Sequence, residues 1–129
     1  MLIQNRFLLD TNIIIYYFNG ILEDERIYDI LNDSFNISII TKIEFLGWQR
    51  LLDNPVLRRQ AIDFISNANI YSLNNDIADK TIEIRQKYKI KTPDAIIAAT
   101  AITHNFKLAT NNTDDFEKLE LEILSLAMR

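Results

Sequence analysis

The sequence contains no cysteine and only one histidine among its 129 residues. Without cysteine there are no disulfides, no thiol nucleophile and no zinc site built on cysteine. Two glycines and two prolines leave little material for long flexible linkers. No apolar run approaches the roughly 20 residues that cross a bilayer. Asp10 also interrupts the region in which a signal peptide needs continuous apolar sequence, so we expect a cytoplasmic protein without membrane association.

The composition is that of an ordinary globular protein, with 48% hydrophobic and 25% charged residues. A chain of this length can bury a core, and we expect residues 1–129 to form one domain. The formal net charge of −4 argues weakly against a general nucleic-acid coat, which is normally basic. It does not exclude a nuclease, in which acidic residues gather at a metal site and basic residues line its rim.

Short apolar segments alternate with longer segments of helical periodicity, which is the pattern of βαβ units around a parallel sheet. The expected strands are residues 6–9, 36–40, 69–73, 107–110 and 121–124. The expected helices are residues 12–18, 24–33, 41–52, 55–68, 76–88 and 92–106, followed by a short helical turn at 114–119. The sequence therefore predicts an α/β fold with a mainly parallel sheet.

Four acidic residues stand at equivalent places in this pattern. Asp10 ends the first expected strand, and Glu44 lies in the first turn after the second strand. Asp94 lies in the first turn of the apolar helix at 92–106, and Asp115 follows the strand at 107–110 by a short loop. Ligands of parallel α/β sheets bind beyond the carboxyl ends of the strands. These four carboxylates are therefore the candidate catalytic and metal-binding residues.

Each acid also has a purely structural explanation. Asp10 is well placed to cap the helix that follows it. Thr41 and Glu44 fit a capping box, in which the glutamate returns a hydrogen bond to the threonine backbone. The segment TPD at 92–94 is a well-formed helix start, with an acid favoured by the helix dipole. The remaining acids can be solvated loop residues.

The structural explanations conflict if the strand ends converge. Two carboxylates about 5 Å apart repel by roughly 3 kcal/mol at an effective dielectric constant near 20. A helix N-terminus returns only about 0.3–1 kcal/mol per carboxylate. Either some of the acids stay protonated or a divalent cation neutralises them. Oxygen ligands without cysteine or clustered histidine favour Mg²⁺ or Mn²⁺.

A family resemblance is carried by four segments, LLDTNIII, TKIEF, KTPDAIIAATA and LATNNTDDF. In order and spacing they resemble the motifs of PIN-domain ribonucleases, in particular the VapC-type toxins of bacterial toxin–antitoxin pairs. The resemblance covers essentially the whole chain. It implies a three-layer α/β/α sandwich around a mainly parallel sheet of about five strands. It also implies cleavage of single-stranded RNA with Mg²⁺ or Mn²⁺, a homodimer, and a small antitoxin that covers the cleft.

The resemblance assigns roles to individual residues. Asp10, Glu44 and Asp94 match the three central acids of the family. The last motif offers Asn112 and Asp115, with Asp114 as an extra neighbour, so the identity of the fourth acid stays open. Asp10 and Asp94 are the expected metal ligands, and Glu44 and Asp115 complete the shell or orient the attacking water. The residues expected to hydrogen-bond the carboxylates or a phosphate oxygen are Thr11, Asn12 and Thr110, which equally suit helix caps.

Basic residues around the cleft are the candidates for RNA contacts: Lys42, Arg50, Lys87, Lys89, Lys91 and Lys107. The segment KYKIK at 87–91, just before Asp94, is the most suggestive, although a solvated loop explains it equally well. His104 lies about 15 Å along the helix from Asp94, so it is a poor general base for this site. The apolar segment 13–18 belongs to the core, or leaves part of its surface for a partner.

Three other functions compete with a toxin nuclease. A PIN-domain nuclease of RNA processing would share every residue above and would differ in its neighbouring gene. An aspartyl phosphotransferase also places an aspartate after its first strand but needs a second one two residues later, where this chain has Asn12. A non-catalytic interaction module on the same fold would have lost acids that this chain keeps.

Overall fold

The computed structural model describes residues 6–128, in which strands and helices alternate. The strands are β1 (Phe7–Leu9), β2 (Asn36–Ser38), β3 (Asn69–Tyr71), β4 (Lys107–Ala109) and β5 (Ile123–Leu124). The helices are α1 (Thr11–Phe18), α2 (Arg26–Asp33), α3 (Ile39–Leu46), α4 (Pro55–Ile65), α5 (Asn75–Lys87), α6 (Thr92–Thr103) and α7 (Thr113–Phe116), with a 3₁₀ turn η1 (Gln49–Leu51). In this part of the chain no helix is long and apolar enough to cross a membrane.

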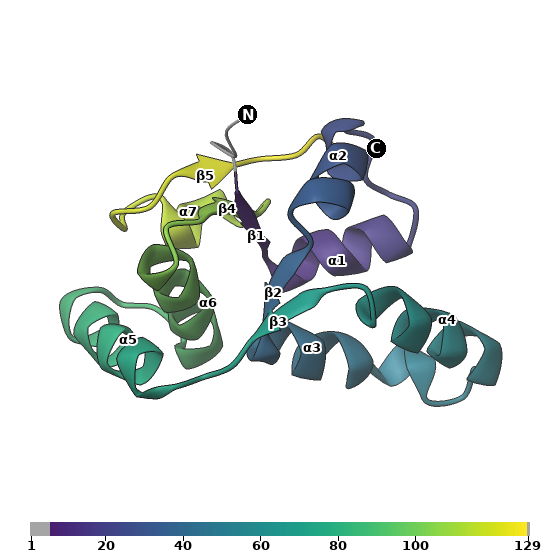
Figure 1. The fold of residues 1–129 in the computed structure, drawn as a ribbon, viewed down its shortest axis with the longest axis horizontal. Coiled ribbons are helices and arrows are strands. Elements are labelled where there is room, and N and C mark those ends of the chain that lie inside the picture. Colours follow the sequence, from purple (N-terminus) through teal and green to yellow (C-terminus); the bar gives the residue numbers. More distant parts are fainter. Residues whose placement is uncertain (1–5, 129) are drawn as a thin grey trace.

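The five strands form one parallel sheet in the order β3-β2-β1-β4-β5. The chain builds outward from β1 through β2 to β3, then crosses back and adds β4 and β5 on the other side of β1 (Figure 1). The order therefore reverses between β1 and β4, where Leu8 pairs with Leu108. In open parallel sheets such a reversal opens a crevice beyond the carboxyl ends of the two strands.

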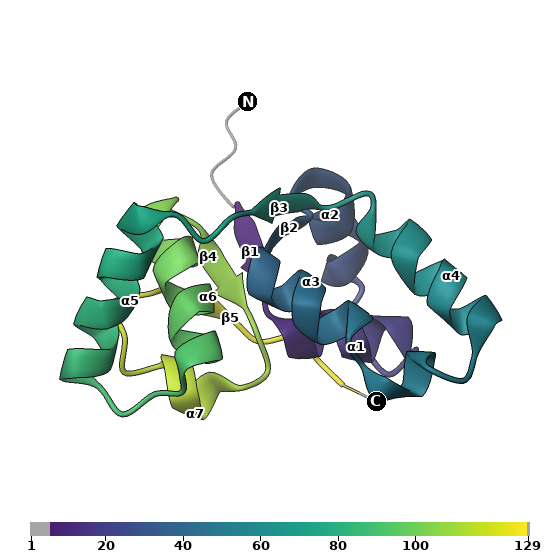
Figure 2. The same ribbon diagram turned by 90° about the horizontal axis from the view of Figure 1, so that it is seen from below.

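Helices cover both faces of the sheet. The first four helices lie on one face and α5 and α6 on the other, with the sheet between them in both views (Figures 1 and 2). Side chains alternate along each strand, so Leu8 packs into the core under α5 and α6 while Leu9 packs into the core under α1 to α4. Both leucines are fully buried. The predicted three-layer α/β/α fold with a five-stranded parallel sheet is confirmed.

The apolar segment 13–18 belongs to the core. Ile13 and Ile14 are fully buried, and the remaining side chains are partly buried against the same cluster. Tyr17 stacks on Phe64 of α4 with ring centroids 5.3 Å apart, and Phe18 meets Phe45 of α3 edge-on at the same centroid distance. This segment therefore joins α1 to α3 and α4.

The region around α3 departs from the sequence prediction. The expected strand 36–40 ends at Ser38, whose side-chain oxygen accepts a hydrogen bond from the Ile40 backbone at 3.0 Å and so caps α3. The expected helix 41–52 ends at Leu46, and a separate 3₁₀ turn follows. The residue after the helix is Gly47, where a Cβ would lie 2.7 Å from the Ile43 carbonyl oxygen, so a larger residue would force a shift. Glycine is the usual residue just past a helix end.

The start of α5 offers a test of local stability. Asn74 caps this helix, with its side-chain oxygen accepting a hydrogen bond from the Ile77 backbone at 3.0 Å. Replacing Asn74 by Ala should lower the free energy of unfolding by about 1 kcal/mol, the usual cost of losing such a cap. Urea unfolding followed by circular dichroism measures the change, and Asn74→Asp, which restores an acceptor, should recover most of it. An unchanged midpoint in the Asn74→Ala variant would contradict the assigned cap.

Candidate active site

The carboxyl ends of β1 and β4 meet at the reversal of the strand order, and Asp10 occupies this point. The Asp10 backbone N–H donates to the Ala109 carbonyl at 2.9 Å and so continues the pairing of the two strands. Thr110, the first residue after β4, donates its hydroxyl to Asp10 Oδ2 at 2.7 Å. The Thr11 backbone donates to the other carboxylate oxygen at 2.8 Å. Asp10 therefore caps α1, as its position before the helix predicts. It also lies at the carboxyl ends of the strands, where the sequence predicts the site.

Burial makes the charge on Asp10 expensive. The residue is 4% exposed. Burial raises the pKa of Asp10 to about 6, against the effect of the hydrogen bonds from Thr110 and Thr11, which lower it. The charges of Asp94 and Glu44 add to the increase. A buried carboxylate with two further negative charges nearby is a candidate for binding a cation.

Asp94 brings the other acids into the same neighbourhood. It lies half-buried in the first turn of α6. Burial raises its pKa, the charges of Asp115 and Glu44 raise it further, and the nearby Lys91 ammonium lowers it. Asp10 feels the charges of Asp94 and Glu44, and Asp94 feels those of Glu44 and Asp115. Acids from segments spread over more than 100 residues therefore lie in one neighbourhood.

Glu44 is held by threonines and not by a capping box. Its Oε1 accepts a hydrogen bond from the Thr11 hydroxyl at 2.6 Å, and that hydroxyl lies 2.9 Å from the hydroxyl of Thr41. The expected bond from Glu44 to the Thr41 backbone belongs to a helix start at 41, whereas α3 begins at Ile39 after its cap Ser38. The capping-box interpretation was therefore wrong, and Thr41 is a neighbour of the site that the sequence prediction did not assign to it.

The three polar residues of the last motif lie in different surroundings. The Asn112 side-chain amide donates to Asp115 Oδ2 at 2.7 Å, and its backbone N–H donates to the Thr110 hydroxyl at 2.9 Å. Asp115 raises the pKa of Asp94 and so faces the cluster. Asp114 is exposed on α7. This arrangement favours Asp115 as the fourth acid, oriented by Asn112.

The fold and the acidic cluster can now be set beside known proteins. The family model described as "PIN domain" matches residues 7–121. The chain belongs to the PIN domain family. The resemblance seen in the four sequence motifs is thereby confirmed.

Individual relatives of this PIN domain come from toxin–antitoxin systems. A chain of a toxin–antitoxin complex from Klebsiella pneumoniae is 33% identical, with a TM-score of 0.74 over 91% of this chain and 94% of that one. A chain of the DNA-bound VapBC crystal structure from Salmonella typhimurium is 25% identical, with a TM-score of 0.79 over 95% and 98% of the two chains. Ribonuclease VapC1 of Rickettsia felis is 44% identical over 46 residues, which are 35% of this chain and 34% of the relative. The match to this curated relative thus spans about a third of its length.

The oxygen donors of this PIN domain fit Mg²⁺ or Mn²⁺. Between residues 6 and 128 no three carboxylate or imidazole groups are placed so that they hold one ion together. Mg²⁺ does not need such a cage, because it binds through one or two carboxylates and keeps several waters. Asn12 Oδ1 is a further acceptor, buried and without a hydrogen-bond partner in the described chain. Carboxylate and amide oxygens are therefore donors of the type that a hydrated Mg²⁺ or Mn²⁺ accepts.

The basic residues of the PIN domain fall into two groups. Lys91 lies close enough to lower the pKa of Asp94, and Lys89, two residues earlier, is exposed. Lys42 is half-buried on α3, two residues before Glu44. Arg50 instead donates to Asn19 at the far end of α1, roughly 13 Å along the helix from Asp10.

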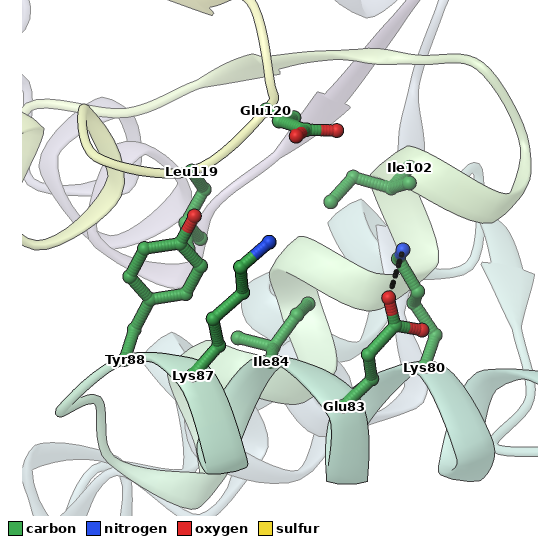
Figure 3. Close-up of a pocket in the computed structure, with 8 residues that line it drawn as sticks. All are labelled: Lys80, Glu83, Ile84, Lys87, Tyr88, Ile102, Leu119 and Glu120. Atoms are coloured by element: carbon green, nitrogen blue, oxygen red, sulfur yellow. Dashed lines mark hydrogen bonds and ion pairs between the residues drawn. The ribbon is translucent and has the colours of Figure 1, made fainter.

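The last two basic candidates lie away from the acids. Lys107 begins β4 and pairs with Glu122 at 3.2 Å, so it lies at the amino end of a strand whose carboxyl end carries the site. Lys87 reaches over a hollow of about 100 Å³ between α5, α6 and the segment after α7 (Figure 3). Ile84, Ile102 and Leu119 contribute apolar side chains to this hollow, and none of the four acids lines it.

His104 takes no part in the acidic cluster. It follows the last residue of α6, and its ring packs against Tyr71 and Phe106 at centroid distances of 4.6 and 5.9 Å. The prediction that it is a residue of the helix end is confirmed. The ionisable groups of the cluster are therefore carboxylates.

Proposed function

We propose that this PIN domain is a metal-dependent endoribonuclease that cleaves single-stranded RNA and acts as the toxin of a VapBC-type pair. The observation that carries the proposal is the convergence of Asp10, Glu44, Asp94 and Asp115 from four separate segments. Burial and the neighbouring carboxylates raise the pKa of Asp10 and Asp94, and the nearby Lys91 ammonium does not offset these effects at Asp94. The family, and relatives named as VapC ribonucleases, support the same activity.

Each residue of the site has a separate proposed role in phosphodiester hydrolysis. When bound, Mg²⁺ or Mn²⁺ supplies Lewis-acid activation of a water and neutralises charge on the phosphate. Asp10 and Asp94 would hold the ion. Glu44 and Asp115 would orient the attacking water, and Thr110 and Asn112 hold Asp10 and Asp115 by hydrogen bonds.

The proposed activity is tested by removing the metal with a chelator and by comparing structured with unstructured RNA. Purified protein is incubated with structured and unstructured RNAs in Mn²⁺, Mg²⁺ or EDTA, beside an Asp94→Asn variant purified in the same way to exclude a contaminating nuclease. We expect cleavage of the unstructured RNA that requires the metal and is abolished by EDTA. Absence of chelator-sensitive cleavage would favour a non-catalytic interaction module.

Lys89 and Lys91 are the proposed phosphate contacts. Replacing both by Ala, in a cleavage-inactive Asp94→Asn background, should weaken binding of single-stranded RNA without changing its sequence preference. The slope of log affinity against log salt should fall by about 0.7 for each lost phosphate contact. Fluorescence anisotropy at several salt concentrations measures this, with Lys107→Ala as the control for charge removed at the opposite end of β4. An unchanged salt slope would contradict the assignment.

The proposed partners are a small antitoxin and a second copy of the chain. The similar structures from Klebsiella pneumoniae and Salmonella typhimurium are described as a toxin–antitoxin complex and as VapBC. An antitoxin arginine or lysine inserted among the acids would neutralise them as a metal does. A small gene beside that of this chain distinguishes a toxin from a PIN-domain nuclease of RNA processing. We also propose that the protein is cytoplasmic, because its proposed substrate is RNA.

A further inference from the structure

Two buried hydroxyl groups connect α1 and α3 beside the acids. Thr41 is fully buried and Thr11 is 8% exposed. Their Oγ1 atoms lie 2.9 Å apart, and Thr11 Oγ1 lies 2.6 Å from Glu44 Oε1. The three side chains thus form one hydrogen-bonded chain from the interior to the acidic cluster.

The chemistry of the groups fixes the direction of this chain. A hydroxyl carries one proton, and an ionised carboxylate can only accept. Thr11 must therefore give its proton to Glu44, and Thr41 must donate to Thr11. Each hydroxyl in the chain has its acceptor, and Thr11 receives one bond while it makes another.

Two other buried threonines, Thr81 and Thr100, use their hydroxyls differently. Thr81 and Thr100 each donate to the carbonyl four residues earlier in their own helix, both at 2.7 Å, which is the common local arrangement. Thr41 lies in the first turn of α3, and the residue four positions earlier, Ile37, is in β2. Its hydroxyl therefore serves a residue of another helix.

Resting on the proposed function, we propose that Thr41 is a positioning residue: it fixes the Thr11 hydroxyl so that this hydroxyl holds the Glu44 carboxylate toward the acidic cluster. Glu44 is exposed and has a long, flexible side chain, so its orientation depends on a bond of this kind. A short hydrogen bond to a carboxylate is among the strong ones. Thr11 also donates its backbone N–H to Asp10. One threonine therefore hydrogen-bonds both Asp10 and Glu44.

The test compares Thr41→Val, which keeps the shape and removes the hydroxyl, with Thr41→Ser, which keeps the hydroxyl. Thr100→Val is the matched control, because Thr100 is equally buried and donates within its own helix. We expect Thr41→Val to lower kcat for RNA cleavage by about 10- to 20-fold with little change in KM, at the lower end of the 10- to 100-fold range of supporting residues. Thr41→Ser should stay within about threefold of the original protein, and Thr100→Val should leave cleavage unchanged.

A second measurement does not depend on cleavage. In NMR spectra of the metal-free protein, the side-chain couplings of Glu44 should report one conformation in the original chain and in Thr41→Ser. They should report averaging in Thr41→Val. If no RNA cleavage is found but this pattern holds, the proposed function fails and the positioning role stands.

Three results would overturn the inference. Full activity of Thr41→Val with an ordered Glu44 would show that the hydroxyl is not needed. Equal losses in Thr41→Val and Thr41→Ser would point to packing, as would an equal loss in Thr100→Val. If Thr41→Val does not fold, Thr41→Ala replaces it, since it also removes the donor and adds no bulk.

Discussion

The Asp94→Asn variant is expected to lose metal-dependent RNA cleavage by at least roughly 100-fold, the upper end of what supporting residues of metal sites contribute. Asparagine has the size of aspartate and suits the first turn of a helix, so α6 should form as before. The substitution removes the negative charge that the ion requires, at a half-buried position facing Glu44 and Asp115. Activity should fall while the circular dichroism spectrum and the unfolding midpoint stay close to those of the original protein.

A matched control separates charge at the site from charge at a helix start. Asp76 lies in the first turn of α5, exposed to solvent, and Asp76→Asn makes the same chemical change there. Cleavage of a single-stranded RNA by this variant should remain within about twofold of the original rate. Full activity in Asp94→Asn would refute the assignment of Asp94 as a metal ligand.

The Asp10→Asn variant should be inactive and yet more stable than the original protein when no metal is present. Asp10 has a pKa of about 6 in the folded protein, compared with 3.8 for an unperturbed group. Between these values the folded state binds more protons than the unfolded state, so stability falls as the pH rises. A shift of about two units corresponds to roughly 3 kcal/mol lost by pH 7. The amide avoids this cost but pairs less well with Thr110, so a net gain of about 1–3 kcal/mol is expected.

Urea unfolding in EDTA at pH 4.5 and pH 7.5 measures both effects. The original chain and Asp76→Asn should lose stability between the two pH values through Asp10, and Asp10→Asn should lose about 1–3 kcal/mol less. Adding Mg²⁺ at pH 7.5 should stabilise the original chain and leave Asp10→Asn nearly unchanged, because only the charged site binds the ion. Lower stability of Asp10→Asn at both pH values would show that its hydrogen bonds outweigh the cost of the buried charge.

The convergence of the acids was predictable because it follows from topology. Parallel strands bring their carboxyl ends to one edge of a sheet, so Asp10 after β1 and Glu44 after the neighbouring β2 come close to each other. The same rule places Lys107, at the start of β4, on the opposite edge, and applying it would have removed this lysine from the expected RNA contacts. Arg50 could not be placed in this way, because the end of α3 at Gly47 was not foreseen.

Local sequence patterns did not predict where α3 begins or which residue caps it. Ser38 and Thr41 are both good helix caps, and Ile39 and Ile40 suit a strand as well as a helix. A hydrogen bond across the fold, from Thr41 to Thr11, accompanies the earlier start at Ile39. Contacts between residues 30 positions apart are not encoded in periodicity, which explains why the capping box looked correct and was not. The pairing of Asn112 with Asp115 escaped for a different reason, since three polar neighbours offered equivalent local geometry.

The bond between Thr110 and Asp10 joins residues 100 positions apart, and this has a consequence for synthesis of the protein. Asp10 leaves the ribosome well before the strand β4 and Thr110, which complete its surroundings. A chain released early, before residue 107, lacks both β4 and the Thr110 hydroxyl, and β1 would lie at an open edge of the sheet. The surroundings of Asp10 can therefore be completed only after the segment through Thr110 has been synthesised.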